Sequence, residues 1–272
     1  MHPRLKEILD KSVEVFRADP RVDGGVHLGS VGKSNEDIFS DVDPLFIVRD
    51  ESFDELDSEL RDIFQRICPP IILWWPESIN TEDYKNYAIF FEQDELLQYD
   101  INIMKASQLN QALGGAVLAQ CGPEDILFDK TGALTAAVEN KTAPHYLPDR
   151  LRWSIEQYWI YVYIHVKYLR RSHTFKLLYA QGMLFQAHLE ILRALYPEVL
   201  WSWWADIAEQ FLKPEHREAL LLYFGATEPN AIASALRQEM DCFSRDARAA
   251  CEAHGIDYPE AFEQSVRDHL AR

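Results

Sequence analysis

Two aspartates in the first half of the chain have the type and spacing of a divalent-metal site. Asp41 and Asp43 flank Val42, immediately before an apolar run. Residues i and i+2 of a β-strand project from the same face, so both carboxylates would lie side by side. Adjacent carboxylates repel each other unless a cation neutralises them. Mg2+ is a hard cation that bridges carboxylates to substrate phosphates, and the pair therefore predicts a magnesium site.

A Gly-Ser pair stands ten residues before the aspartates and could hold phosphate. Gly29 and Ser30 end the short apolar segment 25–29. Glycine lets the backbone turn sharply and approach a phosphate closely, and the serine supplies a hydroxyl donor. Lys33 could offset the phosphate charge. Together with the aspartates, these residues predict a site for a metal-bound polyphosphate.

Asp100 is the best candidate for a third carboxylate. It lies in the segment 98–103, whose apolar residues indicate a central strand. A charge in a buried strand is costly unless it is paired or binds metal, which favours a functional role over an aspartate on an edge strand facing water. Glu92, Asp94 and Glu95 are nearby alternatives, although their polar, turn-like setting indicates solvated side chains.

The composition and net charge limit the classes of partner that the protein is expected to bind. The 272 residues carry a formal net charge of -17 and include 47% hydrophobic residues, which is enough for a folded core. An acidic surface repels nucleic-acid phosphates and attracts a small cation, so we expect no nucleic-acid partner. The N-terminus lacks the apolar segment of a signal peptide, and no apolar run is long enough to span a membrane. Cytoplasmic localisation is the resulting expectation.

Periodicity divides the chain into an α/β domain with a mixed β-sheet, residues 1–143, and an all-α helical bundle, residues 144–272. Helices are expected at the N-terminus, 1–15, and then at 52–68 and 107–118, with strands at 25–29, 45–48, 71–75, 86–91, 96–104 and 126–129. The second half predicts helices over 149–171, 175–196, 201–210, 215–224 and 229–254. Its tryptophans are compatible with a homodimer.

The Gly29-Ser30 pair, the ten-residue spacer and the Asp41-Val42-Asp43 segment resemble the signature of the DNA polymerase β-like nucleotidyltransferases. Within that superfamily, the chain resembles the antibiotic enzymes of lincosamide and aminoglycoside type. The resemblance implies a catalytic N-terminal domain and a substrate-binding helical domain. It also implies that Gly29 and Ser30 hold the triphosphate, that Asp41 and Asp43 bind Mg2+, and that Asp100 is the general base, a metal ligand or both.

The implied reaction moves a nucleoside monophosphate, AMP from ATP or the equivalent from another NTP, to a hydroxyl of a small molecule. The acidic charge favours a cationic aminoglycoside, whereas the helical pattern resembles the lincosamide enzymes. The resemblance also places a basic residue, Lys176, where it could reach the phosphates; a solvated lysine is the alternative. Nucleotidylation of a protein and an inactive nucleotide-binding module are the other functions considered.

Two residues depart from the superfamily pattern. Pro44 follows the aspartates where an apolar strand residue is usual, and because proline lacks the N–H of a ladder donor we expect a bulge or an edge strand there. Asn102 lies two residues after Asp100 on the same predicted face, as an additional polar ligand or as a residue without a role.

Overall fold

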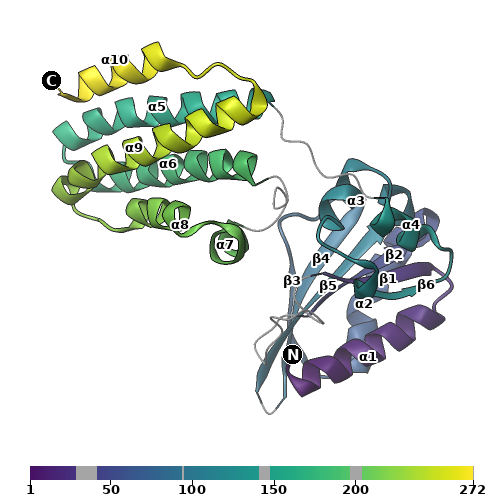
Figure 1. Cartoon of the computed structure of the whole chain (residues 1–272). Coiled ribbons are helices and arrows are strands. Elements are labelled where there is room, and N and C mark those ends of the chain that lie inside the picture. The colour runs from purple at the N-terminus through teal and green to yellow at the C-terminus, as the bar shows by residue number, and fades with distance from the viewer. Residues whose placement is uncertain (29–41, 94, 141–147, 197–203, 272) are drawn as a thin grey trace. The chain divides into compact units, whose positions relative to one another are not determined.

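The chain forms two compact units, Met1–Ala143 and Pro144–Arg272. The computed structural model describes residues 1–28, 42–93, 95–140, 148–196 and 204–271. A mixed sheet with helices makes up the first unit and helices alone make up the second (Figure 1). The predicted fold class is therefore confirmed.

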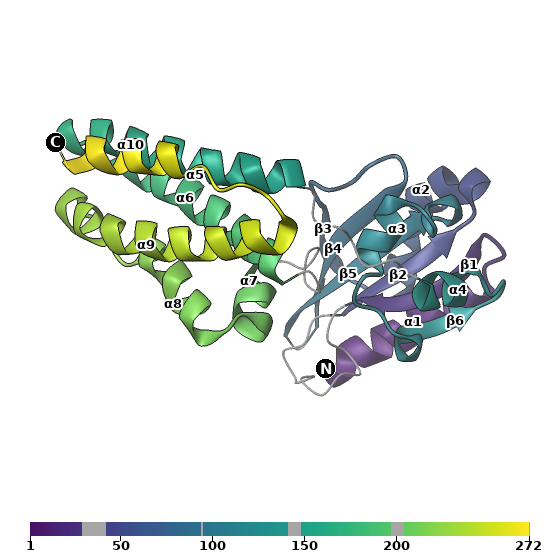
Figure 2. The ribbon, with the colours of Figure 1, turned by 45° about the horizontal axis from the view of Figure 1, so that its top comes forward.

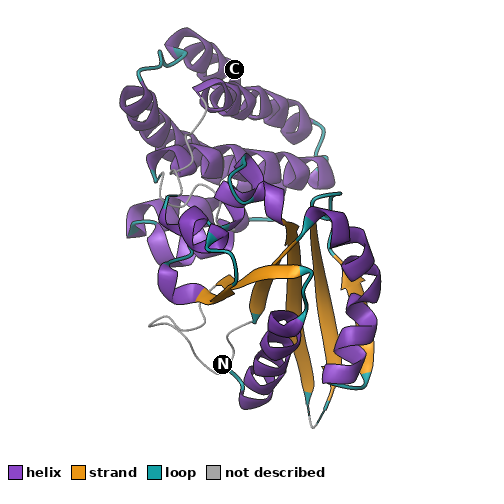
Figure 3. Ribbon diagram, turned by 90° about the vertical axis from the view of Figure 1, so that its right-hand side faces the viewer, coloured by secondary structure: helices purple, strands orange, loops and turns teal. Residues whose placement is uncertain are grey.

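A six-stranded sheet in the order β3-β4-β5-β2-β1-β6 forms the centre of the first unit. Figure 3 shows its strands with helices beside them. Only β2 and β5 pair in parallel among these strands; the other neighbours are antiparallel. The strands are β1 (Val22–Leu28), β2 (Asp43–Val48), β3 (Ile71–Pro76), β4 (Tyr84–Glu92), β5 (Leu96–Lys105) and β6 (Ile126–Asp129). The parallel pair lies inside the sheet, away from both edges.

Helices cover both faces of this sheet. They are α1 (Pro3–Ala18), α2 (Phe53–Ile67), α3 (Ala112–Val117) and α4 (Ala133–Glu139). Along β2, Phe46 and Val48 share a buried core with α1 and α2. Leu45 and Ile47 point to the opposite face and share a core with α4. By the same alternation, Asp43 belongs to the face of Leu45.

The helix predicted over 107–118 is shorter than expected. A single 3₁₀ turn spans Ala106–Gln108, and α3 begins only at Ala112. Gly114 explains how the two pieces fit together, because a Cβ atom there would lie 2.3 Å from the carbonyl oxygen of Gln108. The close backbone approach requires glycine.

The second unit is a bundle in which α5, α6, α9 and α10 lie side by side (Figure 2). Its helices are α5 (Pro148–Arg170), α6 (Thr174–Leu195), α7 (Trp204–Asp206), α8 (Pro214–Leu221), α9 (Pro229–His254) and α10 (Glu260–Ala271), with a π turn at Ile207–Phe211. Tyr158 and Phe243 stack in its core with ring centroids 3.5 Å apart. No helix in the described part of the chain is long and apolar enough to cross a membrane.

A buried polar chain joins three helices of the bundle. Nε2 of Gln181 on α6 donates to Oε1 of Glu239 on α9 at 2.6 Å. Oε1 of Gln181 lies 3.0 Å from Nε2 of His165 on α5. Burial raises the pKa of Glu239 to about 8, against a smaller lowering by Gln181, so this carboxyl group is mostly protonated at neutral pH.

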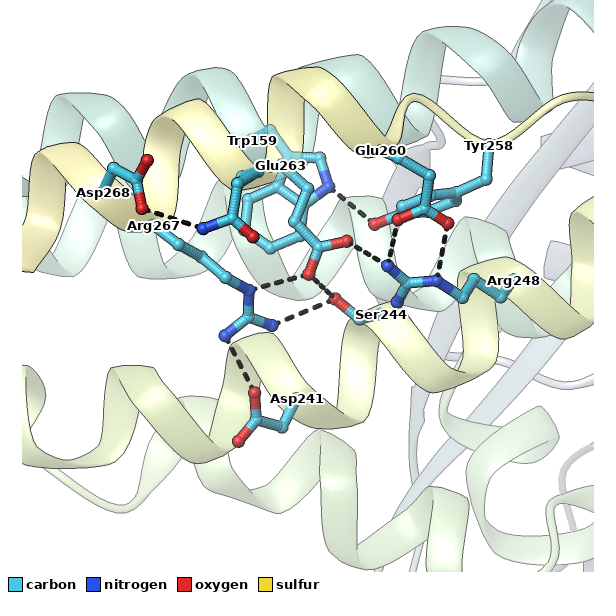
Figure 4. A network of polar contacts seen from close by, with 10 residues as sticks. Trp159, Asp241, Ser244, Arg248, Tyr258, Glu260, Glu263, Arg267 and Asp268 are labelled. Atoms are coloured by element: carbon cyan, nitrogen blue, oxygen red, sulfur yellow. Dashed lines mark hydrogen bonds and ion pairs between the residues drawn. The ribbon is translucent and has the colours of Figure 1, made fainter.

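Helix α10, which the hydrophobic periodicity did not predict, is held to the bundle by a polar network around Glu263 (Figure 4). The Glu263 carboxylate accepts hydrogen bonds from Ser244 at 2.6 Å and from Arg248 and Arg267 at 2.7 Å each. The Arg267 guanidinium also lies over the Trp159 ring, 5.4 Å from its centroid. These contacts fix α10 against both α9 and α5.

Candidate active site

Asp43 and Asp100 lie next to each other on the two central strands. The parallel register pairs Leu45 with Asn102, and the N–H of Asp100 donates to the carbonyl oxygen of Val42 at 3.0 Å. This register places Asp100 beside Asp43, and both residues alternate onto the same face of the sheet. The carboxylates of Asp43 and Asp100 are both half-buried, and they lie side by side although 57 positions separate them in the sequence.

The Asp100 carboxylate is held by its surroundings. Its Oδ1 atom is shielded from solvent, and its Oδ2 atom accepts a hydrogen bond from Nε2 of Gln98 at 3.0 Å. Strand β5 is an interior strand, so the alternative of an edge-strand aspartate facing water does not apply. A carboxylate kept in place within a sheet is suited to accepting a proton from a positioned hydroxyl group.

The expectation that Pro44 marks an edge or a bulge is wrong. Strand β2 lies between β5 and β1, and Pro44 pairs with His27 without a register shift. The side-chain amide of Asn102 donates to the carbonyl oxygens of Pro44 at 3.3 Å and Asp100 at 3.4 Å. In a parallel ladder the residue at position 44 would donate its N–H to the Asp100 carbonyl. Asn102 thus replaces the donor that proline lacks.

Two residues of β4 hold Asn102 in that orientation. The hydroxyl of Tyr84 and the side-chain amide of Asn86 each donate to Oδ1 of Asn102 at 2.5 Å. Asn102 is 2% exposed, and its bond to Tyr84 is buried. Tyr84 and Asn86 were not predicted as site residues, although their i, i+2 spacing places both on one face of β4, which the register with β5 makes the face of the aspartates.

Tyr84 also experiences the charge of the aspartates. Burial raises the pKa of the Tyr84 hydroxyl, and the negative charges of Asp43 and Asp100 raise it further. Tyr84 therefore stays protonated and remains a hydrogen-bond donor. Both carboxylates therefore lie close enough to Tyr84 for their charges to act on its hydroxyl group.

Asp43 and Asp100 fit the donor set of Mg2+, because carboxylate oxygens are its preferred protein ligands and two of them are adjacent here. Within residues 1–28, 42–93, 95–140, 148–196 and 204–271, no group of three or more His, Cys, Asp or Glu side chains could hold a metal ion. The other predicted ligand, Asp41, lies outside the described residues. Asp43 and Asp100 thus supply two carboxylates for a Mg2+ site, and a complete site would need further ligands.

The alternative bases lie farther along the β4–β5 hairpin. Glu92 is exposed and pairs with Leu96, four positions from Asp100, which is about 13 Å along a strand. Glu95 forms an ion pair with His2 at 2.7 Å. Asp94 lies outside the described residues. Neither described glutamate is adjacent to Asp43.

The remaining predicted site residues are Gly29, Ser30, Lys33 and Lys176. Gly29, Ser30 and Lys33 lie outside the described residues. Lys176 belongs to the second unit, near the start of α6, where its ammonium group lies 5.6 Å from the centroid of the Tyr168 ring. Its role toward phosphate therefore stays a prediction.

A known protein family matches nearly the whole chain. The model of the streptomycin adenylyltransferase family matches residues 4–272. The chain belongs to this family. It is therefore an enzyme, a nucleotidyltransferase of the adenylyltransferase type, and the resemblance to antibiotic nucleotidyltransferases of the DNA polymerase β-like superfamily is confirmed. No curated protein matches the chain.

Solved structures of low identity also match this streptomycin adenylyltransferase family member. An aminoglycoside 6-adenyltransferase from Bacillus subtilis is 16% identical, with 98% of this chain and 97% of that chain covered and a TM-score of 0.43. A nucleotidyltransferase-like protein from Exiguobacterium sibiricum 255-15 is 13% identical, with 92% and 77% covered and a TM-score of 0.37.

Proposed function

We propose that this enzyme transfers AMP from ATP to a hydroxyl group of an aminoglycoside and depends on Mg2+. The observation that carries the proposal is the side-by-side placement of Asp43 and Asp100 on one sheet face of a streptomycin adenylyltransferase family member. Asp43 would hold the metal, and Asp100 would activate the acceptor hydroxyl and also bind the metal.

Asp100 is the proposed general base. It would orient the acceptor hydroxyl and take its proton as the oxygen forms a bond to the α-phosphorus of ATP. The bond from that phosphorus to the pyrophosphate oxygen breaks, and pyrophosphate leaves with the bonding electrons. Asp43, with Asp41 and Asp100, would hold Mg2+, which offsets charge on the phosphates. The Gln98 hydrogen bond keeps the Asp100 carboxylate in a fixed orientation.

Other parts of the chain complete the proposal. Gly29 and Ser30 would hold the triphosphate, with Lys33 and Lys176 offsetting its charge. The unit of residues 1–143 would be the catalytic domain and that of residues 144–272 would bind the acceptor. The net charge of -17 supports a polycationic acceptor such as streptomycin over an uncharged or anionic one.

The test is pyrophosphate release with ATP, GTP, CTP or UTP and Mg2+ against streptomycin, other aminoglycosides and lincosamides. Mass spectrometry of the product would identify the modified molecule. We expect release with ATP and an aminoglycoside, a product heavier by one AMP, and no release in EDTA. Modification of a lincosamide or of an added protein, or nucleotide binding without transfer to any acceptor, would contradict the proposal.

A further inference from the structure

One row of residues runs across the sheet through both aspartates and ends at a tryptophan. In strand order, Leu28 pairs with Asp43, Asp43 lies beside Asp100, Asp100 pairs with Ala88, and Ala88 pairs with Trp75. Residues paired across neighbouring strands project from the same face. Trp75 therefore shares the face of the carboxylates, two strands away from Asp100, which is about 10 Å between Cα atoms.

The residue between them is small. Ala88 is buried and carries only a methyl group, so the residue of β4 in this row places no large side chain between Trp75 and Asp100. The neighbouring row continues the apolar surface, with Leu73 paired to Phe90 and Phe90 paired to Gln98. An aromatic residue, a small residue and a carboxylate thus follow one another along one face.

Trp75 is too exposed to be a core residue. It is 53% exposed, whereas Trp74 points to the opposite face, partly buried and packed against the core formed with α1 and α2. Strand β3 is an edge strand, and a large apolar side chain left open there is a liability unless it has a ligand or a partner. The core therefore explains Trp74 and leaves Trp75 without a structural reason.

We propose that Trp75 is the aromatic wall of the acceptor site and stacks against an amino-sugar ring of the substrate while its hydroxyl group reaches Asp100. This inference rests on the proposed function. An indole ring offers a broad apolar face to the C–H groups of a sugar and attracts a nearby ammonium group by a cation–π interaction.

The position of Trp75 in the row favours the acceptor over the nucleotide. Leu28, which precedes the predicted phosphate-binding pair, stands at the Asp43 end of the row, and Trp75 stands beyond Asp100 at the other end. The attacking hydroxyl and the leaving pyrophosphate lie on opposite sides of the phosphorus in an in-line reaction. The base side of the site, where Trp75 lies, is therefore the acceptor side.

The experiment compares steady-state kinetics of the full-length enzyme and its Trp75→Ala, Trp75→Phe and Ile72→Ala variants, with ATP, Mg2+ and the best aminoglycoside. Ile72 is the matched control, because it lies on the same strand, is 52% exposed and is not aromatic. We expect Trp75→Ala to raise the KM of the aminoglycoside about tenfold with the KM of ATP unchanged, and Trp75→Phe to recover part of the loss. Ile72→Ala should match the wild type.

Four results would overturn the inference. An unchanged aminoglycoside KM in a folded Trp75→Ala variant would show that the ring does not contact the acceptor. A raised KM for ATP alone would assign the ring to the nucleotide. A change in oligomeric state by light scattering, without a change in either KM, would assign it to a subunit contact. Wild-type enzyme that modifies no aminoglycoside would contradict the proposed function itself, and the inference would fail with it.

Discussion

The side chain of Asn102 on β5 donates a hydrogen bond to the main-chain carbonyl of Pro44 on β2. These two residues join the strands that carry Asp100 and Asp43, at the position where proline removes a ladder donor. Tyr84 and Asn86 fix the Asn102 amide from the neighbouring strand. The spacing of the two catalytic candidates thus depends on a side-chain network as well as on the sheet ladder.

Replacing Asn102 by leucine should destabilise the first unit. The buried hydroxyl of Tyr84 and the amide of Asn86 would lose their acceptor, and the free energy of unfolding should fall by about 3 kcal/mol. Chemical denaturation measures the loss, and Gln98→Leu, at an exposed position of the same strand, is the control with a small expected effect. Pro44→Val, which restores an N–H donor, should recover part of the stability of Asn102→Leu. If the stability changes of the two single variants simply add in the double variant, the Asn102 side chain does not stand in for the N–H donor that Pro44 lacks.

Glu239 should make the stability of the bundle fall as pH rises. Its pKa is raised from 4.5 to about 8, chiefly by burial, so the folded chain keeps a proton that the unfolded chain releases above pH 4.5. The stabilisation is fully present below pH 4.5 and is lost as pH rises toward 8. The pKa of His165 is lowered, chiefly by burial. This residue therefore makes the free energy of unfolding fall as pH drops below 6.5, which is the opposite pH dependence to that of Glu239.

Denaturation of the wild type and of Glu239→Gln at pH 7.0 and pH 8.5 tests this titration. The glutamine variant should lose less stability than the wild type over this interval, because its side chain does not titrate. Glu252→Gln, an exposed change on the same helix, should follow the wild type. An identical pH slope for the wild type and Glu239→Gln would show that Glu239 is not the group responsible.

Glu263 should hold α10 in place. Burial alone would raise its pKa, but the hydrogen bonds from Ser244 and Arg267 outweigh burial and lower it. The carboxylate therefore stabilises the fold above pH 4.5, and this contribution is lost as pH falls. Glu263→Ala should cost about 2–3 kcal/mol and speed amide hydrogen exchange in α10. Gln264→Ala, which removes only an exposed bond to Asp268, should change little; equal effects of the two variants would refute the assignment.

The sequence predicted most elements for clear physical reasons. Alternating and apolar runs identified the strands, and the prolines at 69 and 70 ended α2 as expected. Helix α10 was missed because its segment is short and strongly charged, with few apolar positions to reveal a period. The helix predicted over 107–118 was too long because the pattern did not show that Gly114 packs against a carbonyl oxygen.

The sequence predicted which aspartates belong to the candidate site, but it did not predict how their strands pair. The cost of burying a charge identified Asp100, and the i, i+2 spacing identified the Asp41 and Asp43 pair. The pairing of β2 with β5 joins strands separated by the β3–β4 hairpin, and local periodicity carries no information on such a register. The position of Pro44 inside the sheet was misjudged for the same reason, because the group that replaces its N–H donor is the side chain of Asn102, on a strand distant in the sequence.

The most direct test of the account is the rate of AMP transfer by folded Asp43→Asn and Asp100→Asn variants, beside Glu92→Gln and Glu95→Gln as carboxylate controls from the same hairpin. Circular dichroism would establish that each variant is folded. We expect kcat of Asp100→Asn to fall about 100- to 10,000-fold, Asp43→Asn to lose Mg2+-dependent transfer, and both glutamate variants to match the wild type. An Asp100→Asn enzyme that turns over at nearly the wild-type rate, or a glutamate variant that is inactive instead, would contradict the assignment of the paired aspartates as the catalytic centre.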